Sequence, residues 1–117
     1  MPTFQRGYAH HLAMWKAARL LVVDTFTEAE RAVAAGAELT SAMRADMRIA
    51  AVYATDASRV IGEWAHLAAG TTAIRDGSRL ERAFRDLYTG TQHAFINERV
   101  AIAASQMLLG LAEDPRL

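Results

Sequence analysis

The distribution of proline constrains the fold of this chain more than any other feature. Of the 117 residues only Pro2 and Pro115 are proline, and both lie close to the chain ends. A proline inside a helix removes a backbone donor and clashes with the preceding turn, so nothing between these two residues forbids a helix. Alanine is also frequent and runs of β-branched residues are rare, which favours helix. The chain is therefore predicted to be all-α.

Glycines and capping residues divide the sequence into four predicted helices. Gly36, Gly70 and Gly110 each follow an apolar pattern, where glycine commonly ends a helix. Ser78 and Glu81 form a capping-box pattern, with the serine as N-cap. The predicted helices run from Phe4 or Tyr8 to Ala35, from Ser41 to Ala69 with Thr40 or Ser41 as cap, from Ser78 to Phe95, and from Asn97 as N-cap to Gly110. Because short connections make neighbouring helices antiparallel, we expect one domain, residues 1–117, folded as an antiparallel four-helix bundle.

The first two predicted helices carry long apolar seams. The seam of the first helix is predicted to be Leu12, Trp15, Val22, Phe26, Ala29 and Val33. The seam of the second helix is predicted to be Met43, Met47, Ala50, Ala54, Ala57, Ile61 and Ala68, with a second apolar flank at Val52, Tyr53 and Val60. A helix that is apolar on two flanks needs more than one packing partner. In so short a chain this indicates an oligomer interface or a missing domain.

Charge and composition exclude several functional classes. Lys+Arg and Asp+Glu each number 13, and a net charge of zero argues against a general nucleic-acid binder. The chain has no cysteine, which excludes disulfides, zinc–thiolate sites and cysteine nucleophiles. No apolar run is long enough to span a membrane and no signal-peptide pattern opens the chain, so a cytoplasmic protein is expected.

The four histidines form no recognisable metal site. His10 and His11 are adjacent, so on a helix they point about 100° apart and cannot chelate one ion; both are predicted to lie on the surface. His66 is predicted to be a packing histidine in the core or at an interface. No metal is therefore expected.

Polar side chains gather on one face of the third predicted helix, in the segment "ERAFRDLYTGTQHAF" at residues 81–95. Arg82, Asp86, Thr89 and His93 are spaced by four, three and four residues, so they share that face. Leu80, Phe84, Leu87 and Thr91 are predicted to face inward. Two interpretations stay open from spacing alone. The face is either a solvated surface, with Glu81 and Arg85 as an ordinary i, i+4 ion pair, or one wall of a binding site.

The segment "LAAGTTAIRDGSRLERAFRDLYTGTQHAFINE", residues 67–98, resembles the C-terminal helical domain of the acyl-CoA dehydrogenase superfamily. Within it, the segment is most similar to the branch of two-component flavin-dependent monooxygenases. The resemblance rests on a small-residue turn at 70–73, a cap at 78–80, Arg85-Asp86 and Gln92-His93. The sequence departs from the branch at Arg75, where an aromatic residue is common, and at Arg79, where proline is usual.

The resemblance implies a flavin site and an oligomer. The chain would correspond to the C-terminal third of a longer enzyme whose FMN or FAD lies between a middle β domain and this bundle. It implies that Gly70, Thr71, Thr72 and Arg85 lie near the flavin, and that His93 is the catalytic residue close to the isoalloxazine ring. The catalytic carboxylate of true acyl-CoA dehydrogenases is not identifiable, which favours the monooxygenase branch.

The same resemblance predicts a homo-oligomer, either a dimer or a tetramer. A separate chain could supply the missing flavin-binding domains, and this chain alone is expected not to bind flavin. A stand-alone helical oligomerisation module without catalysis, or a remnant that folds but serves no flavin, is the alternative.

Overall fold

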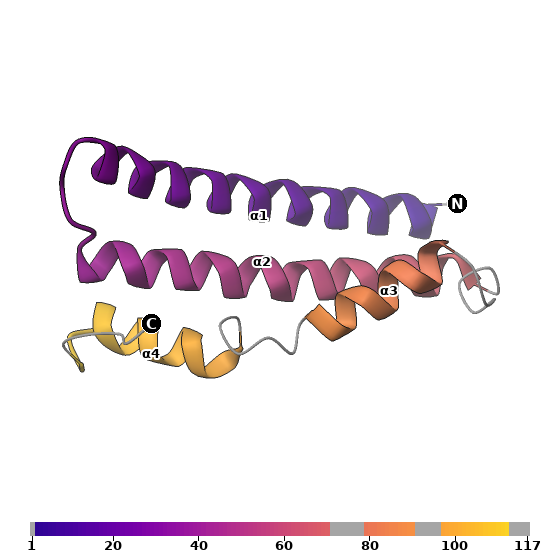
Figure 1. Cartoon of the computed structure of the whole chain (residues 1–117). Coiled ribbons are helices and arrows are strands. Elements are labelled where there is room, and N and C mark those ends of the chain that lie inside the picture. The colour runs from indigo at the N-terminus through magenta and orange to yellow at the C-terminus, as the bar shows by residue number, and fades with distance from the viewer. Residues whose placement is uncertain (1, 71–78, 91–96, 113–117) are drawn as a thin grey trace.

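The computed structural model describes residues 2–70, 79–90 and 97–112, and every regular element within these ranges is an α-helix. The helices are α1 (Pro2–Ala34), α2 (Ser41–Ala68), α3 (Arg79–Gly90) and α4 (Glu98–Leu108) (Figure 1). The prediction of an all-α fold with four helices is confirmed. α1 begins earlier than predicted because proline is tolerated in the first turn of a helix. The predicted Ser78 cap and the predicted extension of α3 to Phe95 lie outside the described residues.

Two of the helices, α2 and α4, start at side-chain N-caps that the sequence predicts. The Thr40 hydroxyl accepts a hydrogen bond from the Met43 N–H at 3.1 Å, and the Asn97 side chain accepts one from the Val100 N–H at 3.2 Å. Each cap satisfies a backbone donor that has no partner inside its helix. Gly36 follows α1 with φ at +83°, a conformation that favours glycine and allows the chain to turn toward α2.

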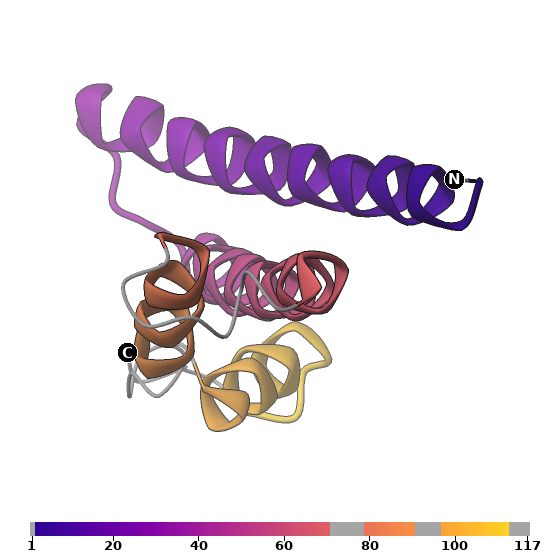
Figure 2. The same ribbon diagram turned by 90° about the vertical axis from the view of Figure 1, so that its right-hand side faces the viewer.

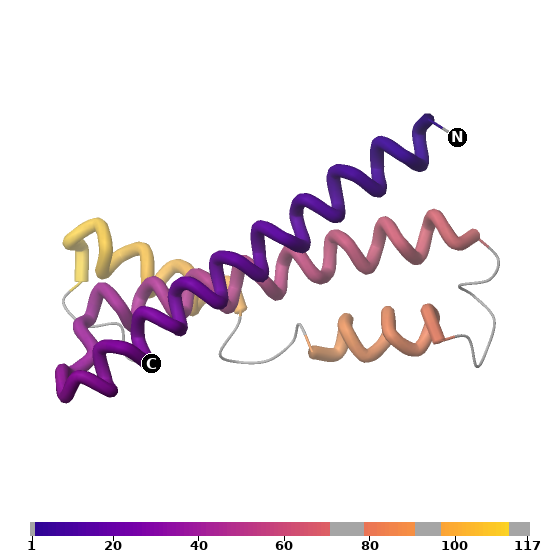
Figure 3. The backbone as a smooth tube through the Cα atoms, turned by 90° about the horizontal axis from the view of Figure 1, so that it is seen from above, coloured from indigo at the N-terminus to yellow at the C-terminus, as the bar shows by residue number. Residues whose placement is uncertain are grey.

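α2 is the central helix of the molecule. α1 packs antiparallel to it along one side, and in the described residues α1 contacts neither α3 nor α4. α3 lies along the C-terminal half of α2, and α4 continues in the direction of α3 along the N-terminal half (Figure 1). Figure 2 shows α3 and α4 at different positions around α2, with α1 on the opposite side. Viewed from above, α1 crosses α2 at an angle (Figure 3).

The buried core is small and consists mainly of alanine. Its buried residues within the described ranges are Ala18, Ala29, Ala45, Ala50, Val52, Ala57, Val100 and Ala104. Short side chains at these positions allow the helices to approach closely, since the distance between helix axes depends on the side chains at the contact. The second flank of α2 is divided: Val52 is buried, whereas Tyr53 and Val60 are exposed.

The predicted seam of α1 is wrong for its largest side chains. Trp15, Phe26 and Val33 are exposed. The face that meets α2 carries Gly7, where a Cβ would contact Trp64, and the buried Ala18. The small residues therefore set the rotation of α1 about its axis, because only they permit the close approach to α2. Trp15 and Phe26 lie beside this face and remain partly exposed.

Gly7 and Gly62 provide a matched test of this close packing. A Cβ at Gly7 would lie 2.6 Å from Nε1 of Trp64 and close to two carbons of the same rigid ring. A Cβ at Gly62 would lie 2.5 Å from Cδ2 of Leu87, which is the end of a flexible side chain. We expect Gly7→Ala to lower the free energy of unfolding by about 1–2 kcal/mol, because overpacking exceeds the gain in helix propensity of about 1 kcal/mol.

Gly62→Ala serves as the control, since it brings the same gain in helix propensity. Leu87 can rotate away, so the variant is expected to equal the parent chain or to exceed its stability by up to about 1 kcal/mol. Urea unfolding of the three proteins measures the difference. Equal stability of the two variants would contradict the close contact between Gly7 and Trp64.

Candidate functional site

The inward side of α3 is held against the C-terminal half of α2. Gly62 of α2 provides the space for Leu87, and Phe84 lies close to the same glycine. The rings of His66 and Phe84 stack with centroids 4.5 Å apart. His66 is half-buried there and packs between two helices, as predicted. These contacts fix which face of α3 points away from the chain.

The opposite face of α3 is polar and accessible. Arg82, Asp86 and Thr89 are exposed, and the Thr89 hydroxyl donates to the backbone carbonyl of Arg85 at 3.0 Å. The guanidinium Nε of Arg85 lies 2.8 Å from Oε1 of Glu81, so the predicted i, i+4 ion pair is formed. Such a surface pair contributes a few tenths of a kcal/mol at most. The Arg85 side chain is 68% exposed, and a guanidinium has more donors than this one contact uses.

Gly70 lies two residues beyond the end of α2 at Ala68, and that end of α2 lies near the start of α3 (Figure 1). Its φ is +61°, and no atom of the described residues other than its chain neighbours lies within 4 Å of the position that a Cβ would occupy. The described residues therefore leave the backbone of Gly70 open to a close approach by another group. Among the predicted site residues the structure describes Gly70 and Arg85; Thr71, Thr72 and His93 lie outside the described residues.

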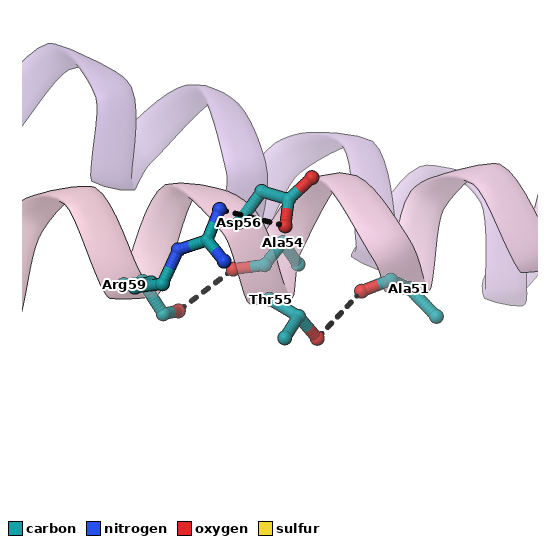
Figure 4. A network of polar contacts seen from close by, with 6 residues as sticks. Ala51, Ala54, Thr55, Asp56 and Arg59 are labelled. Atoms are coloured by element: carbon teal, nitrogen blue, oxygen red, sulfur yellow. Dashed lines mark hydrogen bonds and ion pairs between the residues drawn. The ribbon is translucent and has the colours of Figure 1, made fainter. Parts of the chain in front are cut away.

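The polar side chains in the middle of α2 satisfy one another or their own backbone. Thr55 donates to the Ala51 carbonyl at 2.9 Å, and Arg59 lies 3.5 Å from Asp56 (Figure 4). Each contact joins two residues about one helical turn apart on α2, so it stabilises the surface of this helix locally. They create no second polar site in this part of the helix.

An aromatic cluster joins the start of α1 to the end of α2, and the sequence did not reveal it. The Trp64 ring stacks on Phe4 at 5.6 Å and on His11 at 4.7 Å between centroids. Nδ1 of His11 lies 2.7 Å from the Gly7 carbonyl oxygen, within hydrogen-bond distance. The prediction of a surface position is therefore wrong for His11, which is half-buried against Trp64, whereas His10 is exposed. The available signal was Gly7, whose lack of a side chain leaves room for a ring.

The described helices hold neither a metal-ligand cluster nor a membrane-spanning segment. Within residues 2–70, 79–90 and 97–112 no three His, Asp or Glu side chains are grouped so as to hold a metal ion. In the same ranges no helix has both the length and the apolar character needed to cross a bilayer.

The chain matches a known protein family. The family described as acyl-CoA dehydrogenase, C-terminal domain, matches residues 1–98, which include all of α1, α2 and α3. The chain belongs to this family. Acyl-CoA dehydrogenases generally use flavin, and their domains generally form oligomers. No curated protein and no solved structure matches the chain.

The family match places the two described site residues within the acyl-CoA dehydrogenase domain. Gly70 and Arg85 both lie inside the matched range, and α4 lies beyond it except for Glu98. The four-helix fold agrees with that domain. The match therefore confirms the resemblance of segment 67–98 to the acyl-CoA dehydrogenase superfamily. It does not test the resemblance to the monooxygenase branch.

Proposed function

We propose that this acyl-CoA dehydrogenase domain forms the C-terminal wall of a flavin site in a cytoplasmic flavin-dependent monooxygenase, and that it also provides an oligomerisation surface. The observation that carries the first part is the accessible polar face of α3, beside the open turn at Gly70, in a family that generally uses flavin. The choice of the monooxygenase branch rests on the resemblance at Gln92-His93 and on the missing catalytic carboxylate.

The described residues fit a flavin in two respects. Arg85 is a mostly exposed cation with donors beyond its contact with Glu81, which suits a phosphate of FMN or FAD. Gly70 has no side chain, and no described residue beyond its chain neighbours lies within 4 Å of its Cβ position, so its backbone can approach a ligand closely. Thr71 and Thr72 follow Gly70 in the sequence and would add hydroxyl and backbone donors. The remainder of the pocket would come from parts of the enzyme outside residues 1–117.

His93 is the proposed catalytic residue. An imidazole titrates near neutral pH, so it can hold or move a proton beside the reacting atoms. The bound reduced flavin would supply the electrons that activate O₂ for hydroxylation of a small apolar or aromatic substrate. In this proposal His93 would hold or move a proton beside the flavin ring, while Arg85 and residues 70–72 would hold the cofactor in place.

Flavin titration in two settings tests the proposal. The isolated chain is expected to bind FMN and FAD no tighter than about 0.1 mM, because too few contacts remain to offset the cost of immobilising the ligand. The chain combined with the polypeptide that supplies the other domains, fused or separate, is expected to hold flavin stoichiometrically. Calorimetry and the visible absorbance of the purified proteins measure both. If the combined protein, made of this chain and the polypeptide with the other domains, holds no flavin, the proposed role in flavin binding is wrong.

An arginine on α4 provides the matched control for the site. Arg85→Ala in the combined protein is expected to weaken flavin binding about tenfold, which corresponds to roughly 1.4 kcal/mol. Arg99→Ala, which removes an exposed arginine on α4 away from the polar face of α3, is expected to leave binding unchanged. Equal effects of the two substitutions would indicate a general charge effect and not a contact made by Arg85.

The alternative function is a stand-alone oligomerisation module without catalysis. The small alanine core and the exposed apolar residues of α1 favour a surface that packs on another chain. The two functions differ in flavin content, because a pure oligomerisation module would associate without retaining FMN or FAD in any combination of domains.

A further inference from the structure

The ion pair in the first two turns of α3 is unevenly exposed. Nε of Arg85 lies 2.8 Å from Oε1 of Glu81, and the Glu81 side chain is 16% exposed whereas the Arg85 side chain is 68% exposed. The carboxylate is therefore the packed partner, and the guanidinium is the accessible one.

A second ion pair, between Asp56 and Arg59 on α2, has the features of an ordinary surface pair. Oδ1 of Asp56 and Nη2 of Arg59 are 3.5 Å apart, and the two side chains are 56% and 42% exposed. Both partners are solvated, and the contact uses a terminal nitrogen of the guanidinium. The pair on α3 differs in each respect, because it is shorter, its carboxylate is packed and its contact is made by Nε.

Stability does not account for the arrangement on α3. Packing a carboxylate removes it from water, and a mostly exposed guanidinium offsets that cost only in part. Glu81 lies in the first turn of α3, where a negative charge is favourable, but an exposed carboxylate would obtain the same benefit. What the contact does achieve is to restrict the flexible side chain of Arg85.

The geometry of this contact leaves the outer end of Arg85 for a ligand. A guanidinium carries five N–H donors in a planar fork, and Nε supplies only one of them. The two terminal nitrogens can therefore donate to two oxygens of one phosphate. Phe84, which precedes Arg85, stacks on His66, and Gly62 provides the space for Leu87. Because these contacts fix the rotation of α3, they also fix the side of the helix from which Arg85 projects.

We infer that Glu81 is a positioning residue that holds Arg85 ready for the phosphate of the flavin, so that the site prefers a phosphorylated flavin to riboflavin. This role rests on the proposed flavin site. An arginine that is already held in place loses less conformational freedom when it binds a ligand. The negative charge of Glu81 acts in the opposite direction, because it weakens the attraction between Arg85 and a phosphate. Substitution separates the two effects.

Titration of the combined protein with FMN and with riboflavin tests the role of Glu81, because these two ligands differ by one phosphate. Glu81→Gln removes the charge but keeps an oxygen that accepts from Nε, so it is expected to bind FMN at least as tightly as the parent. Glu81→Ala also loses that oxygen, and it is expected to lower the preference for FMN over riboflavin about fivefold. The affinity for riboflavin is expected to be equal in all three proteins. Asp56→Ala, which breaks the exposed pair on α2, is the control and is expected to change neither affinity.

The preference for FMN separates positioning from a purely structural role. Glu81 also occupies the predicted capping-box position, and a damaged helix would lower the affinities for both ligands equally, which would overturn the inference. If both Glu81 variants bind FMN more tightly than the parent, the glutamate acts only through its charge and the inference is wrong. In an Arg85→Ala background, Glu81→Ala is expected to have no further effect on the preference.

The same titration distinguishes this inference from the proposed function. A parent combined protein that binds FMN and riboflavin equally overturns the positioning role of Glu81 and leaves the proposed roles of Gly70 and His93 intact. A combined protein that binds neither ligand overturns the proposed flavin site and the role of Glu81 together.

Discussion

Replacement of His93 by asparagine in the combined protein is expected to lower the rate of product formation about 100-fold. A preorganised proton donor in a water-poor site contributes about 3 kcal/mol to stabilising the transition state, and asparagine keeps a similar shape without a group that titrates near neutral pH. Flavin binding is expected to stay near the parent value, because the contacts proposed to hold the cofactor are those of Gly70, Thr71, Thr72 and Arg85. Hydrogen peroxide is expected to accumulate in place of product.

The measurement is the yield of product and of hydrogen peroxide for each reduced flavin oxidised. His10→Asn is the matched control, since His10 is an exposed histidine on α1, away from the proposed site. It is expected to leave the rate, the yield and the flavin affinity unchanged. If His93→Asn keeps the parent rate and yield, then His93 has a structural role and the proposed proton transfer is wrong.

The helices of this protein could be predicted because their signals are local. The lack of internal proline permits helix throughout. Thr40 and Asn97 are N-caps of α2 and α4, as their positions in the sequence predict. Gly36 and Gly70 end the two long helices with positive φ. Each of these effects depends on a few neighbouring residues, so one sequence is sufficient to recognise it.

The rotation of α1 could not be predicted in the same way. Trp15 and Phe26 are the largest apolar residues of its middle part, so hydrophobicity alone predicts that they belong to the core. The structure instead packs Ala18 and Ala29 against α2 and exposes the aromatic pair. Hydrophobicity favours burial of the largest apolar side chains. Two helices approach closely, however, only where the side chains at their contact are small.

The candidate site was predictable to different degrees. Spacing alone predicted the ion pair between Glu81 and Arg85, which the structure contains. The family followed from the resemblance over residues 67–98, and the comparison confirms it at the level of the acyl-CoA dehydrogenase domain. The place of His11 against Trp64 depends on two helices meeting, so no local pattern indicates it. The role of His93 stays a prediction.

Trp64→Ala is expected to lower the free energy of unfolding by about 2–3 kcal/mol. Loss of a fully buried tryptophan costs about 3–5 kcal/mol, and Trp64 is half-buried. Its ring is the common contact of Phe4 and His11 and also lies against Gly7. The first turns of α1 have no other helix to hold them in the described part of the chain. Amide hydrogen exchange is therefore expected to accelerate most over residues 2–14.

Trp15→Ala is the control, because Trp15 and Trp64 are the two tryptophans of the chain and the Trp15 side chain is 49% exposed on α1. At a concentration low enough to keep the chain monomeric, this variant is expected to change the free energy of unfolding by less than about 0.5 kcal/mol. At higher concentration it is expected to weaken self-association, whereas Trp64→Ala acts on the fold itself. The contrast separates packing within the chain from packing between copies. Equal losses of monomer stability in the two variants would contradict the distinct positions of the two rings.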